Sequence, residues 1–230
     1  MLKKELNNLL LDFKINKKYW LTNNLTGDDY DNHRSKPAPY IKKTIEIAKL
    51  LNLKNFVEIG STRFAVTEKC IRFYDEKFHE YVSPPCCCDG HSNFFWVDAG
   101  FEVYTVDIDE NCKNGVVWSY NNLGREVPKN LNIEIPKDGI EFLSEFKKTI
   151  DVLYLDGWDV GTPNYAEKHL EAYNIAKPKL SETHIIVIDD TDYLTESGGK
   201  DKLLSPHLIK EDYFLLFNGR QTAFLKHKDF

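Results

Sequence analysis

Carboxylate side chains stand at or near the ends of several short apolar runs in this sequence. They are Glu58, Asp107, Asp156, Asp189 and Asp190, in the runs FVEIG, YTVDID, VLYLDG and IIVIDD. Carboxylate oxygens accept hydrogen bonds from sugar hydroxyls, bind divalent cations or act as bases. A single Asp after a strand is as often a helix cap or a turn residue. Because four runs share the feature, we expect these carboxylates to build a site.

The elements that position these residues follow from hydrophobic periodicity. The apolar runs alternate with helical patterns, which predicts an α/β fold with a mostly parallel sheet and helices on both faces. Near the C-terminus, DYFLLF and RQTAFLKH flank Asn218-Gly219, the pair that a tight antiparallel hairpin prefers. We predict strands at 56–60, 101–109, 131–136, 150–156 and 183–190, helices at 91–100, 138–149 and 165–180, and a terminal hairpin, giving about seven strands in all. Ligands of such sheets bind outside the carboxyl ends of the strands.

The first 50 residues precede the predicted sheet. Apolar residues at helical spacing predict an amphipathic helix over 1–19, and a second helix begins at Tyr40 after a polar loop. With 230 residues and 42% hydrophobic content, the chain is long enough for one sizeable core. We therefore expect a single domain over 1–230, with an N-terminal helical extension (1–50) as a cap and a core over 55–230.

Charge and cysteine content narrow the partners. Lys and Arg total 30 against 36 Asp and Glu, a formal net charge of -6, so nucleic acid is not an expected partner. No segment is apolar enough for an export signal or a membrane span, which favours a cytoplasmic protein. Five cysteines make an odd count, and the consecutive Cys86, Cys87 and Cys88 lack the spacing of zinc ligands. We expect reduced thiols.

The ordered motifs VEIGS, GHSN, VYTVDID, DGIEFL, VLYLDG and VIDD resemble those of class I S-adenosylmethionine-dependent methyltransferases, over roughly residues 55–225. The resemblance implies a Rossmann-like, doubly wound fold and S-adenosylmethionine as cofactor. Asp107 would bind the ribose hydroxyls, and Asp138 with Gly139 would contact the adenine. The full set of cofactor-binding positions that it implies is Glu58, Gly60, Ser61, Gly90, Ser92, Asp107, Asp138 and Gly139.

The glycine-rich loop of that family is interrupted here. Gly60 and Asp107 are separated by more chain than one helix and one strand need, whereas Gly90 lies at an ordinary distance from Asp107. We interpret residues 62–89 as an insertion in the cofactor loop. Two roles stay open for it: a lid beside the site, or a packing element or subunit contact.

The acceptor side resembles the catechol and caffeoyl-coenzyme A O-methyltransferases, and in outline the macrocin-type sugar O-methyltransferases. The resemblance implies Mg²⁺ or another divalent cation on Asp156, Asp189 and Asp190, although the catechol branch has Asn at the position of Asp190. The catechol branch also has a lysine at the position where this sequence has Asp159. Candidate catalytic residues are then Asp156, Asp159 and His169, and the implied reaction is O-methylation of a small molecule or sugar-like acceptor.

Three other functions compete with this one. A nicotinamide-dependent dehydrogenase lacks support because no compact G-x-G-x-x-G is present. A nucleic-acid methyltransferase gains little support from the charge. A degenerate Rossmann-like domain that binds a nucleotide or a protein without turnover is the main alternative. The acceptor and the oligomeric state, including a homo-oligomer, stay open.

Overall fold

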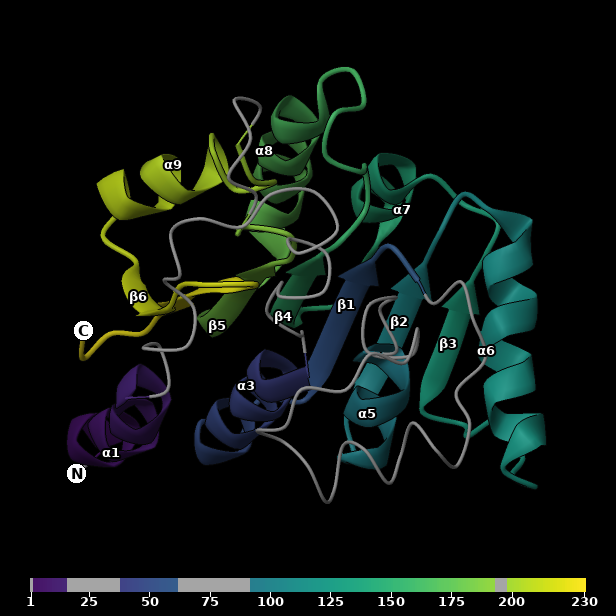
Figure 1. The fold of residues 1–230 in the computed structure, drawn as a ribbon, viewed down its shortest axis with the longest axis horizontal. Helices are drawn as coiled ribbons and strands as arrows, with labels where there is room; N and C mark the ends of the chain where they lie inside the picture. The colour runs from purple at the N-terminus through teal and green to yellow at the C-terminus, as the bar shows by residue number, and fades with distance from the viewer. Residues whose placement is uncertain (1, 16–37, 62–91, 193–197) are drawn as a thin grey trace, which may run out of the picture.

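The computed structural model describes residues 2–15, 38–61, 92–192 and 198–230, which build one seven-stranded sheet in the order β3-β2-β1-β4-β5-β7-β6 (Figure 1). The strands from β1 to β5 pair in parallel, and β7 pairs antiparallel with both β5 and β6. The predicted mostly parallel sheet with a terminal hairpin is confirmed. The strands are β1 (Asn55–Ile59), β2 (Glu102–Val106), β3 (Leu131–Glu134), β4 (Ile150–Leu155), β5 (Leu180–Ile188), β6 (Phe214–Phe217) and β7 (Thr222–Lys226).

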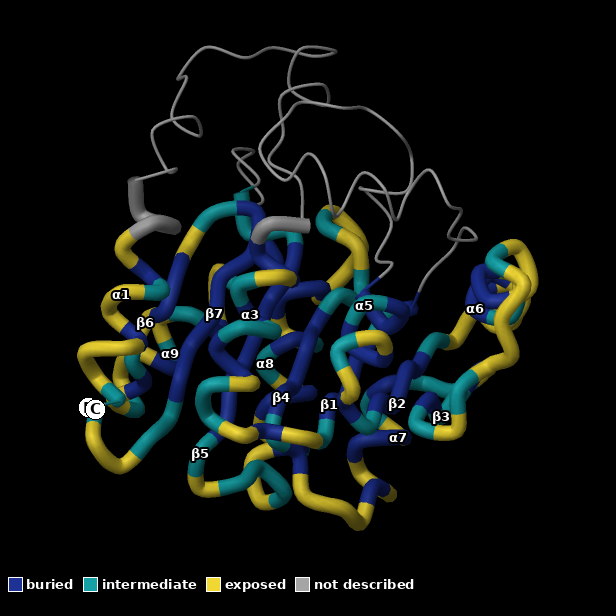
Figure 2. Tube along the Cα trace, turned by 90° about the horizontal axis from the view of Figure 1, so that it is seen from below, coloured by how far each residue is buried: buried dark blue, intermediate teal, exposed yellow. Residues whose placement is uncertain are grey.

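Helices cover both faces of the sheet because successive strand residues point to opposite sides. Phe56 of β1 packs in a core with helices α1, α3 and α5, whereas its neighbour Val57 packs in a second core with α7, α8 and α9. The strands are buried along most of their length (Figure 2). The helices are α1 (Leu2–Ile15), α3 (Ala38–Leu50), α5 (Ser92–Asp98), α6 (Glu110–Asn122), α7 (Gly139–Glu145), α8 (Tyr165–Ala176) and α9 (Leu204–Lys210).

Most predicted elements are present with shifted ends. The predicted helix at 165–180 ends as α8 at Ala176, and a 3₁₀ turn over Lys177–Lys179 leads directly into β5. Helices α6 and α9 were not among the predicted segments. The described part of the N-terminal extension is helical, as predicted, and α1 packs against α3 and β6. None of the described residues in the structure forms a helix that is both long and apolar enough to cross a membrane.

The strand order reverses between β1 and β4. From β1 the chain winds outwards through β2 to β3, then returns to β4 on the other side of β1 and continues to β5. At such a reversal the connections leave in opposite directions and open a crevice at the carboxyl ends of the strands. Residues that follow β1, β2, β4 and β5 are therefore brought to the same place.

Candidate cofactor and acceptor site

The turn after β1 is pressed against the end of β4. Gly60 has a φ of +94°, and its N–H donates to the carbonyl of Val106 at 2.8 Å. A Cβ at Gly60 would lie 2.7 Å from both the Asp156 carbonyl carbon and the Gly157 nitrogen. Since real Cβ atoms do not approach backbone so closely, only glycine fits. Glycine at this position therefore lets the turn after β1 lie directly against the end of β4.

A buried hydrogen-bond network lies beneath this turn. Glu58 accepts a hydrogen bond from the Ser92 hydroxyl at the start of α5, and Thr105 Oγ1 of β2 lies 2.6 Å from Glu58 Oε2. Thr105 Oγ1 also lies 2.7 Å from Ser61 Oγ. Having one hydroxyl hydrogen, Thr105 donates to ionised Glu58 and accepts from Ser61. Burial raises the pKa of Glu58 to about 7, although hydrogen bonds from Ser92, Thr105 and Asn93 oppose the shift.

Asp107 is fixed at the end of β2 by two backbone donors. Its Oδ2 accepts the N–H of Ser61 at 2.8 Å, and its Oδ1 accepts the N–H of Asp109 at 2.9 Å. A carboxylate has about four lone-pair positions, so each oxygen can still accept a hydrogen bond from a ligand hydroxyl. Asp109 caps helix α6 by accepting the N–H of Asn111.

Asp138 and Gly139 form the start of α7. Asp138 caps the helix by accepting hydrogen bonds from the N–H groups of Ile140 and Glu141. Both residues also line the pocket described below. A Cβ at Gly139 would overlap the side chain of Ile59 and lie 3.5 Å from the indole of Trp158. The helix start is therefore packed against the end of β1.

Two apolar side chains flank this part of the crevice. Ile108, directly after Asp107, is 72% exposed, and Trp158 follows β4 in a left-handed conformation with φ of 51°. The Lys168 ammonium lies 5.9 Å from the centre of the Trp158 ring. His169 packs edge-on against the same ring at 5.3 Å between centroids. Trp158 is thus held in place from α8.

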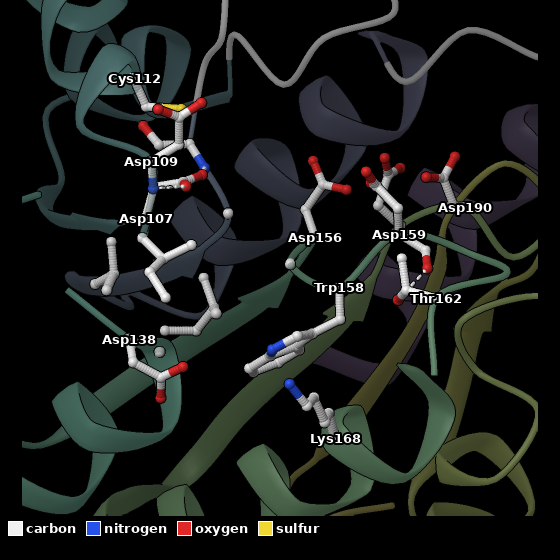
Figure 3. A pocket seen from close by; sticks show the side chains of 18 of the residues that line it. Asp107, Asp109, Cys112, Asp138, Asp156, Trp158, Asp159, Thr162, Lys168 and Asp190 are labelled. Carbon is white, nitrogen blue, oxygen red and sulfur yellow. Dashed lines mark hydrogen bonds between the residues drawn. The ribbon is translucent and has the colours of Figure 1, made fainter. Parts of the chain in front are cut away.

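Ile108, Trp158 and Lys168 are among the residues that line a cavity of about 700 Å³, within the range of small-molecule sites. Figure 3 shows Asp107, Asp109 and Cys112 at the left, Asp159 and Asp190 at the right, and Asp156 above Trp158 in the middle. Of the predicted site residues, the cavity is lined by Gly60, Ser61, Asp107, Asp138, Gly139, Asp156, Asp159, Asp189 and Asp190. Glu58 and Ser92 lie behind the wall. Gly90 and the predicted insertion at 62–89 lie outside the described residues.

Besides Asp156, the sequence indicated Asp159 and His169 as catalytic candidates, and the structure places these two differently. Asp159 is exposed at the cavity rim, where its carbonyl accepts hydrogen bonds from the Thr162 N–H at 3.0 Å and hydroxyl at 2.7 Å (Figure 3). His169 is fully buried behind Trp158 and does not line the cavity. Burial lowers the pKa of His169 to about 3, so the imidazole is neutral at physiological pH. The sequence pattern alone gave no means to separate these two positions.

Asp156, Asp189 and Asp190 come together at the ends of β4 and β5, with one oxygen of each within 4.8 Å of the others. Two cationic side chains that sequence reasoning missed accompany them. Lys200 Nζ lies 2.8 Å from Asp156 Oδ1 and 3.1 Å from Asp190 Oδ2. Arg220 Nη2 lies 2.7 Å from Asp190 Oδ1 and 3.3 Å from Asp189 Oδ2. No sequence signal links either residue to the strand ends.

This arrangement does not fit a divalent cation. An ion bound to Asp156 Oδ1 and Asp190 Oδ2 lies roughly 2.0–2.6 Å from each oxygen, and so against the ammonium that already contacts both. Among the described residues, Asp189 Oδ1 is buried without a hydrogen-bond partner. Asp189 Oδ1 and the second oxygen of Asp156 are the carboxylate oxygens of these two residues that Lys200 and Arg220 leave over, and the burial of Asp189 Oδ1 keeps it away from the waters that complete the coordination of Mg²⁺.

Comparison with known proteins agrees with the fold. No protein-family model and no curated protein matches the sequence. Among solved structures, the S-adenosylhomocysteine-bound methyltransferase PaMTH1 from Podospora anserina aligns with a TM-score of 0.53 at 14% identity, over 96% of this chain and 88% of that one. A proposed caffeoyl-CoA O-methyltransferase from Staphylococcus aureus aligns with a TM-score of 0.53 at 14% identity, over 81% of each chain.

A proposed rRNA methylase from Clostridium thermocellum aligns with a TM-score of 0.52 at 10% identity, over 80% of this chain and 95% of that one. The described chain therefore has the Rossmann-like fold of class I S-adenosylmethionine-dependent methyltransferases. Since these similar structures include both an O-methyltransferase and an rRNA methylase by description, the fold leaves the acceptor open.

Proposed function

We propose that this protein is an S-adenosylmethionine-dependent methyltransferase that methylates an oxygen of a small molecule. The observation that carries the proposal is the geometry around Asp107. Its carboxylate is fixed by two backbone N–H donors, and it lies beside the turn at Gly60, where an added Cβ would clash with the backbone after β4. This suits a grip on the two vicinal hydroxyls of a ribose. S-adenosylmethionine supplies an electrophilic methyl group on its sulfonium sulfur.

The walls of the crevice support an adenosyl ligand. Ile108 and Trp158 offer apolar surfaces for a flat purine ring, and Asp138 with the backbone of Gly139 offers an acceptor and a donor for its edge. Gly60 lets the backbone approach the ligand closely. These groups bind and orient the methyl donor S-adenosylmethionine, and such positioning is the main contribution of the protein to a direct methyl transfer.

Asp156 is the group we assign to proton transfer. Lys200 contacts one oxygen of its carboxylate, which leaves the other for an acceptor hydroxyl. Burial and the neighbouring Asp189 and Asp190 raise the pKa of Asp156, against the lowering effect of Lys200, so the carboxylate is a stronger base than usual. As the acceptor oxygen bonds to the methyl carbon, its proton passes to Asp156, and the carbon–sulfur electron pair returns to sulfur.

A small acceptor suits the charge of the crevice better than a nucleic acid does. The lining includes seven aspartates, and among the described lining residues only Lys168 and Arg220 are basic. Arg220 is itself paired with Asp189 and Asp190. Carboxylates repel phosphate groups, and the chain as a whole carries a formal charge of -6.

The test is methyl transfer to a panel of hydroxyl-bearing small molecules, followed by mass spectrometry of S-adenosylhomocysteine release. Asp156→Asn keeps an oxygen for Lys200 but removes the base, so kcat is expected to fall by about a hundredfold or more. Asp159→Asn, at the exposed rim, is the matched control and should change kcat by less than about threefold. Cofactor binding with no release to any acceptor would contradict turnover and favour a binding domain.

A further inference from the structure

Lys200 is the most deeply buried cation beside the cavity. Its side chain is 1% exposed, and its ammonium donates to the Asp156 carbonyl at 2.7 Å and to Asp156 Oδ1 at 2.8 Å, with Asp190 Oδ2 at 3.1 Å. Asp156 therefore takes two of the three N–H donors of the ammonium, and Asp190 forms an ion pair with it. Its backbone is anchored too, because the Lys200 N–H donates to the Asp190 carbonyl at 3.2 Å.

The charge of Lys200 persists despite its burial. Burial lowers the pKa of the ammonium, but Asp156, Asp190 and Asp189 more than offset this and hold the pKa above its usual value. Arg220 closes the other side of the cluster from the turn between β6 and β7, and its carbonyl accepts the N–H of Thr191 at 3.0 Å. Lys200 and Arg220 thus carry two positive charges against the three carboxylates of the cluster. Little negative charge is left for a bound metal ion to neutralise.

We propose that Lys200, assisted by Arg220, takes the place of a divalent cation, so that this site holds its carboxylates with the chain's own cations. This inference rests on the proposed function where it concerns the acceptor, because it restricts which acceptors the methyltransferase could bind. A buried ion pair whose partner is removed leaves uncompensated charge, and here removal of Lys200 would expose two carboxylates to solvent cations. The structure therefore assigns Lys200 the role of a positioning residue for Asp156.

The proposal restricts the acceptor. A divalent cation with open coordination positions would bind two neighbouring oxygens of one acceptor and lower their pKa. The Lys200 ammonium donates two hydrogen bonds to Asp156 and is ion-paired with Asp190, so it is already occupied by acceptors of the chain. The site then receives a single nucleophilic hydroxyl at Asp156 and gains nothing from a vicinal diol.

Cation binding tests this directly, because it can be read without methyl transfer. The free Mn²⁺ signal in electron paramagnetic resonance would be titrated with wild type, Lys200→Ala, Lys200→Met and the control Lys202→Ala. Lys202 is exposed and two residues away. We expect no binding by wild type or K202A at millimolar Mn²⁺. K200A and K200M should bind Mn²⁺ with a Kd at least about tenfold below that concentration limit, and Mn²⁺ should raise their melting temperatures.

Micromolar Mn²⁺ binding by the wild type that is lost in Asp189→Asn would overturn the proposal, as would folded K200A and K200M proteins that gain no Mn²⁺ affinity. If neither variant folds, the wild-type titration with its D189N control still decides. Calorimetry with S-adenosylhomocysteine on the same samples separates the two proposals. If the wild type did not bind S-adenosylhomocysteine, this would count against the proposed function and leave the Mn²⁺ result unaffected.

Discussion

Asp107 and Glu58 are both acidic residues near the turn after β1, yet their surroundings give them different tasks. Asp107 lines the cavity and is held by two N–H donors, which suits it to ligand hydroxyls. Glu58 is 2% exposed, bonds to Ser92 and Thr105, and reaches no part of the cavity. In our proposal Asp107 binds the ligand, whereas Glu58 links β1 to Ser92 at the start of α5 and to Thr105 of β2.

The raised pKa of Glu58 predicts a pH-dependent stability. Between about pH 4.5 and 7 the native state holds a proton that the unfolded chain has released, so the unfolding free energy falls as pH rises through this window. Glu58→Gln removes the titration. Relative to the variant, wild type should lose about 3 kcal/mol across the window, measured by urea unfolding at several pH values. Parallel curves for the two proteins would contradict the assignment.

Sequence reasoning at this scale found the acids but not their partners. Asp156, Asp189 and Asp190 follow two strands of the predicted sheet, and the pairing of β4 with β5 in the structure brings them together. Lys200 and Arg220 come from a turn and from the hairpin, where nothing local indicates what they contact. Placement of this kind depends on tertiary packing.

Among the elements, the strands were the most predictable because continuous apolar runs mark buried parallel strands. Helix α6 was missed because Asn, Gly115 and Ser dilute its pattern, although Cys112, Val116 and Tyr120 form a buried stripe at helical spacing. Helix α9 was missed because it has seven residues and contains Pro206, which only the first turn of a helix tolerates.

The β1 turn is the element on which the site depends most. Gly60→Ala would force a Cβ against the backbone of Asp156 and Gly157 and add left-handed strain, so we expect a loss of about 2–4 kcal/mol and of cofactor affinity. Gly100 has the same φ of +94° with nothing within 4 Å of an added Cβ. Gly100→Ala should therefore show the strain alone, about 1–2 kcal/mol, with unchanged affinity.

Thermal unfolding and calorimetry with S-adenosylhomocysteine would separate the two variants. If G60A and G100A lost equal stability and both retained the cofactor, the close approach of the β1 turn to β4 would have no functional importance.

At the scale of the whole molecule, charge separates the remaining acceptor classes. A formal charge of -6 and an acidic crevice predict that a short fluorescent RNA shows no change in anisotropy even at low salt, where phosphate contacts are strongest. Tight, salt-dependent RNA binding would instead favour the activity named for the Clostridium thermocellum protein. The net charge can be read from the sequence because it does not depend on the fold, whereas the acidic lining of the crevice is seen only in the structure.

The most direct test of the central claim is isothermal calorimetry with S-adenosylhomocysteine on wild type, Asp107→Ala, Asp107→Asn and Asp109→Ala. Asp109 caps α6 two residues away, so D109A is the matched control. We predict micromolar binding by wild type and D109A, and a loss of about a hundredfold or more in both Asp107 variants, since two hydrogen bonds to a carboxylate are removed. No binding by wild type, or equal binding by all four proteins, would contradict the account.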